Sequence, residues 1–92
     1  MKLTIVIPAL NEEESIANTI DQCKAAAAGI ILHSMITDVQ IIVVSDGSTD
    51  RTVEITKHYS DIKLIVFEKN RGYGAAIKTG WELGKGDFLG FM

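Results

Sequence analysis

The alternation of apolar, β-branched runs with helix-like stretches is the feature that most constrains this 92-residue chain. Residues 3–7, 39–44 and 62–67 are nearly all apolar or β-branched, as expected of strands that are covered on both faces. Stretches with apolar residues at helical spacing separate these runs. The alternation predicts an α/β fold with a Rossmann-like, doubly wound parallel sheet. Hydrophobic residues make up 47% of the chain, which is enough for a buried core.

Sequence signals also predict where the first elements end and begin. Pro8 should end the first strand, and Asn11 should cap the following helix in a capping box with Glu14. This helix should bury a stripe that consists of Ile16, Ile20, Cys23, Ala27 and Ile31. The sequence leaves two positions open for the C-terminal end of this helix, Gly29 or a residue near His33.

Charge and cysteine content exclude several classes of protein. A formal net charge of −3 argues against nucleic acid as a partner, because binding phosphates requires clustered Lys and Arg. Cys23 is the single cysteine, so it can form no internal disulfide, and its apolar position predicts a buried, unreactive thiol. No apolar run reaches membrane-spanning length and no signal peptide precedes the first strand. The sequence therefore predicts a cytoplasmic protein.

Acidic residues follow the first two strands, at Glu12 and Asp46. Ligands of open α/β sheets bind beyond the carboxyl ends of the strands, and a carboxylate there can accept hydrogen bonds from ribose hydroxyls or a base N–H. It would repel a diphosphate, so the nucleoside end of a ligand fits better. Two other interpretations stay open: Glu12 could be a first-turn acid that stabilises a helix, and Asp46 could be a turn residue.

A Gly-x-Gly segment, Gly72 to Gly74, opens the third predicted helix. Backbone N–H groups at a helix start can bind an anion. Close packing of Gly74 and Gly80 against the sheet explains these glycines equally well.

Four segments in order carry a resemblance to a known family: residues 6–13 (VIPALNEE), 42–50 (IVVSDGSTD), 70–76 (NRGYGAA) and 86–89 (GDFL). Together they resemble the N-terminal half of family 2 glycosyltransferases of the GT-A fold, most of all the dolichyl- or polyprenyl-phosphate hexose synthase branch. The resemblance implies four parallel strands in the order 3-2-1-4 with helices on both faces. Ser45 stands where many relatives have a second Asp, and Leu10 where they often have Tyr.

The resemblance also implies a function: transfer of a hexose, with inversion, from a UDP- or GDP-sugar to an acceptor such as a polyprenyl phosphate. By similarity, Pro8, Leu10 and Glu12 would line the nucleoside pocket, and Val44 and Asp46 would flank and hydrogen-bond the base. The Mg²⁺ or Mn²⁺ of such enzymes is held by an Asp-x-Asp motif, which we expect beyond Met92. No catalytic residue is assigned within the chain, and we expect residues 1–92 to be inactive alone.

These expectations define one unit, residues 1–92, as the nucleotide-binding half of a catalytic domain that is cut within the fourth strand. That strand would be an exposed edge, which predicts a homodimer through edge pairing. The full-length protein could also lie at the cytoplasmic face of the membrane. Two alternatives remain, a non-catalytic nucleotide-binding or regulatory α/β module and a sugar nucleotidyltransferase, although the latter normally requires a basic, glycine-rich loop after the first strand.

Overall fold

A computed structural model describes residues 1–33, 35–84 and 86–91. Strands and helices alternate along the chain: β1 (Lys2–Ala9), α1 (Ile16–His33), β2 (Asp38–Asp46), α2 (Thr52–Thr56), β3 (Lys63–Phe67), α3 (Tyr73–Leu83) and β4 (Phe88–Phe91). The four strands form one parallel sheet in the order β3-β2-β1-β4. This order and the α/β class confirm the prediction. The predicted cut within the fourth strand falls at Met92, which lies outside the described residues.

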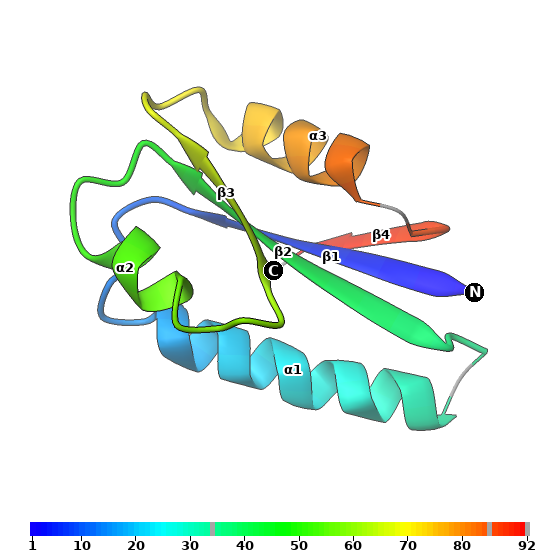
Figure 1. The fold of residues 1–92 in the computed structure, drawn as a ribbon. Coiled ribbons are helices and arrows are strands. Elements are labelled where there is room, and N and C mark those ends of the chain that lie inside the picture. Colours follow the sequence, from blue (N-terminus) through cyan, green and yellow to red (C-terminus); the bar gives the residue numbers. More distant parts are fainter. Residues whose placement is uncertain (34, 85, 92) are drawn as a thin grey trace.

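Helices cover both faces of the sheet (Figure 1), with α1 and α2 on one side and α3 on the other. Odd-numbered residues of β1 such as Ile5 and Ile7 pack with Ile16 and Ile20 of α1. Even-numbered positions face α3, so that Val6 joins a second core. This alternation follows from the two-residue period of a strand, and it explains why the central strands are apolar on both faces.

A glycine allows α3 to lie close to the sheet. A Cβ at Gly80 would come 2.5 Å from Cγ1 of Val6, too close for any side chain at this position. The packing interpretation is therefore confirmed for Gly80. At Gly74 it is wrong, because a Cβ there would have open space around it.

Helix α1 follows its predicted stripe except at the C-terminal end. Ile16, Ile20, Cys23 and Ala27 are buried, and burial raises the pKa of the Cys23 thiol, as expected for an unreactive cysteine. Ile31 is 42% exposed, so its assignment to the stripe was wrong. The helix runs on to His33, which decides for the later of the two predicted ends.

Two predicted boundaries near the start of the chain are wrong. Pro8 does not end β1, which continues to Ala9 in register with Ser45. Its missing N–H is tolerated because the described pairing with β4 stops at Val6. Asn11 and Glu14 do not form a capping box: α1 begins at Ile16, and the Asn11 side chain bonds to another loop.

Candidate functional site

A cleft lies at the carboxyl ends of β1 and β2, where the fold predicts ligands to bind. It encloses about 470 Å³ and is lined by Pro8, Ala9, Leu10, Glu12, Asp46, Asn70, Gly72 and Tyr73. The structure thus brings together four of the five residues predicted to contact a nucleoside. The fifth, Val44, is fully buried in the core beneath α3 and does not line the cleft.

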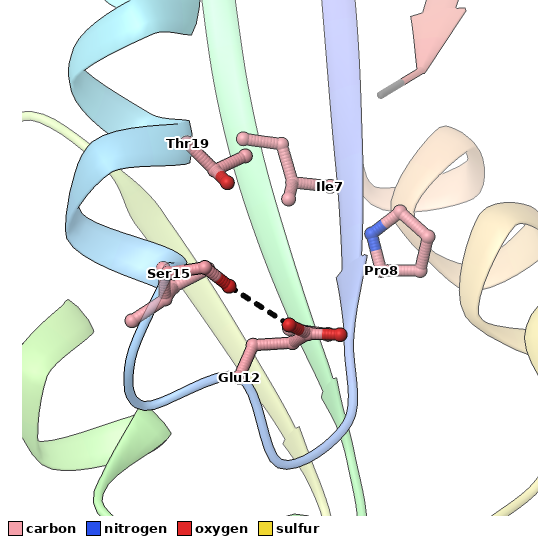
Figure 2. Close-up of a pocket in the computed structure, with 7 residues that line it drawn as sticks. Ile7, Pro8, Glu12, Ser15 and Thr19 are labelled. Carbon is pink, nitrogen blue, oxygen red and sulfur yellow. Dashed lines mark hydrogen bonds between the residues drawn. The ribbon is translucent and has the colours of Figure 1, made fainter.

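A smaller hollow of about 190 Å³ adjoins β1 on the α1 side. Figure 2 shows Glu12 between β1 and the start of α1, where its carboxylate accepts a hydrogen bond from the Ser15 hydroxyl at 2.8 Å. Pro8 and Glu12 line this hollow as well as the cleft. The Glu12 carbonyl accepts the N–H groups of Ser15 and Ile16, which places Glu12 just ahead of the helix. Glu12 is exposed.

Asp46 ends β2 and is almost completely buried, at 5% exposure. Its carboxylate accepts the backbone N–H of Arg71 at 2.6 Å and that of Gly72 at 3.0 Å. Each oxygen keeps further lone pairs for a ligand. Asp46 therefore holds the segment before α3 in place, a contact that its assignment as a ligand-binding residue or a turn residue did not include.

The contact between the end of β2 and the loop after β3 also requires a glycine directly after Asp46. Gly47 has a φ of 77°, and a Cβ there would lie 2.6 Å from the backbone N of Asn70. The Asn70 carboxamide donates to the Asp46 carbonyl at 3.4 Å. The end of β2 and the loop after β3 are thus in direct backbone contact, which brings Asn70, Gly72 and Tyr73 to the cleft.

A second set of hydrogen bonds, here called the loop clasp, joins residues 9–13 to residues 48–52. Across it, the Glu12 N–H donates to the Thr52 hydroxyl at 2.8 Å, and the Glu13 N–H donates to Asp50 at 3.1 Å. The Thr49 N–H donates to the Asn11 carboxamide oxygen at 2.8 Å. These bonds hold the loops after β1 and β2 against each other, and so fix one wall of the cleft.

The Asp50 carboxylate accepts hydrogen bonds from both segments of the loop clasp. Partial burial favours its protonated form, but the hydrogen bonds that it accepts from the hydroxyl and N–H of Thr52 and from the Glu13 N–H outweigh that effect. The net result is that the pKa of Asp50 is lowered. A carboxylate that stays ionised keeps the loop clasp intact at neutral pH.

Apolar side chains complete the cleft. Leu10 is 43% exposed and Tyr73 is 59% exposed, although large apolar groups are usually buried. Tyr73 was not among the residues assigned to the site from the sequence. The available signal was its position directly after the loop that follows β3, since the carboxyl ends of parallel strands meet at one edge of the sheet.

A divalent metal has no candidate donor set in the described part of the chain, where no three His, Cys, Asp or Glu residues converge. Asp46 and Glu12 both line the cleft, but two carboxylates do not make a site of the usual six oxygen ligands. The described residues therefore do not fit the metal that the family implies.

Comparison with known proteins identifies the family of this chain. The profile described as glycosyl transferase family 2 matches residues 4–92. The chain therefore belongs to glycosyl transferase family 2.

Individual relatives agree with this assignment. A dolichyl-phosphate β-glucosyltransferase of Drosophila melanogaster is 31% identical over 99% of this chain, which covers 30% of that protein. Glucosyl-3-phosphoglycerate synthase of Mycobacterium tuberculosis, solved with Mn²⁺ and UDP, superposes with a TM-score of 0.71 at 28% identity, over 99% of this chain and 32% of that one. TarS of S. aureus gives a TM-score of 0.79 at 25% identity, over all of this chain and 16% of that one.

The chain spans less than a third of the length of these relatives. Of the helices in the described part of the chain, none has the length and apolar content that a bilayer crossing requires.

Proposed function

We propose that this chain supplies the nucleoside-binding part of a glycosyltransferase that uses a nucleotide-diphospho-sugar donor. One observation carries the proposal: in a chain of this family, the cleft beyond β1 and β2 combines two carboxylates with exposed apolar side chains. A nucleoside presents the same combination, with hydroxyl and N–H donors on the sugar and base and an apolar ring face.

Each lining group has a chemical role in this proposal. Glu12 accepts hydrogen bonds from ribose hydroxyls, and Asp46 accepts one from a base N–H through lone pairs that Arg71 and Gly72 do not use. Pro8, Leu10 and Tyr73 contact the base. The diphosphate points away from the carboxylates, because like charges at close range repel.

On this proposal, transfer of the sugar also uses groups that lie outside the described part of the chain. A divalent metal would stabilise the charge that develops on the departing nucleotide diphosphate. We place its ligands, and the group that activates the acceptor, beyond Met92. Residues 1–92 alone would then bind the nucleotide without transferring a sugar.

The acceptor, the oligomeric state and the location of the protein are part of the same proposal. The Drosophila relative is named for a dolichyl phosphate, which supports a lipid phosphate as acceptor and a cytoplasmic protein that works at the membrane face. Strand β4 is at the edge of the sheet, and edge pairing of two copies would form a homodimer. A monomer at high concentration in sedimentation equilibrium would contradict the dimer.

Isothermal titration of the chain with UDP and with GDP tests the binding proposal. We expect saturable binding with a preference for one nucleotide, and about tenfold weaker binding by Glu12→Gln, since that change removes a charge-assisted acceptor. Glu14→Gln is the matched control, because Glu14 is exposed but does not line the cleft. Equal losses in both variants, or no binding by the wild type, would contradict the proposal.

A further inference from the structure

Asn11 has an unusual backbone conformation at the margin of the cleft. Its φ is 52°, in the left-handed region that few residues other than glycine adopt. It lies between Leu10 and Glu12, both of which line the cleft. Local strain of this kind persists only where the surrounding structure compensates for it.

The compensation comes from the loop after β2. The carboxamide oxygen of Asn11 accepts the Thr49 N–H at 2.8 Å, and the Asn11 N–H donates to the Ser48 hydroxyl at 3.2 Å. Asn is one of the few residues that tolerates this φ and also carries an acceptor. Glycine would keep the conformation without the acceptor, and alanine would keep neither.

The turn at Asn11 determines where Glu12 lies. A strand continued through Asn11 would carry Glu12 away from Pro8 by about 3.3 Å per residue. Instead the chain reverses after β1, and the Glu12 carboxylate points back towards the strand (Figure 2). The Glu12 N–H then bonds to Thr52 at 2.8 Å, which holds the reversed segment.

We propose that Asn11 is a positioning residue for the nucleoside: its left-handed turn, held by Thr49, places Leu10 and Glu12 against the ligand. The inference rests on the proposed nucleotide binding. Asn11 acts through its two neighbours, and its own side chain stays bonded to Thr49 when the ligand is present.

Nucleotide affinity of two variants tests this role. Using UDP and GDP as probes, we expect Asn11→Ala to weaken binding of the preferred nucleotide by about tenfold or more, since it loses both the hydrogen bond and the tolerated φ. Asn11→Gly should fall between alanine and wild type, because glycine restores the turn alone. Amide relaxation of residues 10–13 should show mobility that increases from wild type to Asn11→Gly and from Asn11→Gly to Asn11→Ala.

Tyr59→Phe is the matched control for a merely structural effect. It removes the hydrogen bonds from the Tyr59 hydroxyl to Asp21 and to the Ala17 carbonyl, which join α1 to the turn after α2, outside the cleft. It should lower the unfolding temperature and leave nucleotide affinity unchanged.

Failure of this inference can be told apart from failure of the proposed function. If the wild type binds a nucleotide and Asn11→Ala binds it equally well, the positioning role is overturned. A loss of affinity in Tyr59→Phe that matches its loss of stability would overturn it too. If the wild type binds neither nucleotide, the proposed function itself is wrong.

Discussion

The sheet and the loops at its carboxyl end are held together by different forces. Between the sheet and its helices, residues such as Val6, Ile20 and Val43 are completely buried and pack by apolar contact. In the loops, residues 10–13 are exposed and are held by hydrogen bonds to residues 48–52. Apolar burial is non-directional and dominates stability, whereas hydrogen bonds add little net stability but fix positions. The difference indicates that the core determines whether the chain folds and the loops determine what it binds.

The largest expected effect is on the core side of this comparison. Ile20→Ala should lower the free energy of unfolding by about 2–5 kcal/mol, because it removes a fully buried side chain and leaves a cavity. Leu32→Ala, at a position that is 76% exposed on the same helix, should change it by less than about 0.5 kcal/mol. Urea unfolding measures both, and equal losses would contradict the assigned core.

Asp46→Asn acts where the two regions meet. The Asn side chain can accept one of the two N–H groups from Arg71 and Gly72, but it turns an NH₂ donor towards the other. We expect a loss of about 1–3 kcal/mol in the free energy of unfolding, together with weaker nucleotide binding. Denaturant unfolding and calorimetry measure the two effects. A stable variant with unchanged affinity would show that Asp46 neither holds the loop nor binds the ligand.

Acid should weaken the loop clasp through Asp50. Its pKa in the folded state is lowered, so its contribution to stability is fully present above the unfolded-state pKa of about 3.9 and is lost as the pH falls through the lower folded value. Asp50→Asn should therefore be less stable than wild type near about pH 6, and the difference should shrink towards about pH 2.5. A difference in unfolding free energy that does not vary with pH would contradict this assignment.

The smallest effect is expected for Ser45→Ala. The Ser45 hydroxyl is buried, and within the described part of the chain it has no hydrogen-bond partner. Removing such a group relieves a desolvation cost, so the free energy of unfolding should stay equal or rise by up to about 1 kcal/mol. A clear loss of stability would indicate that the hydroxyl is bonded in solution.

The difference between the apolar core and the hydrogen-bonded loops also determines what could be predicted from the sequence. Strand order followed from the resemblance alone. The strands that are apolar on both faces and most of the α1 stripe followed from apolar periodicity, which reflects burial. Asn11 was misassigned as a helix cap because its real partner, Thr49, is 38 residues away. The contacts of Asp46 with Arg71 and Gly72 were missed for the same reason. Hydrogen bonds between loops leave no periodic pattern in a single sequence.

An NMR titration of the labelled chain with UDP and, separately, GDP tests the central claim most directly. The account predicts saturable shifts centred on Leu10, Glu12 and Asp46, extending to Tyr73 across the cleft, with one nucleotide preferred. Shifts confined to other surfaces, or no saturable change at about millimolar ligand, would contradict the claim that this cleft binds the nucleoside.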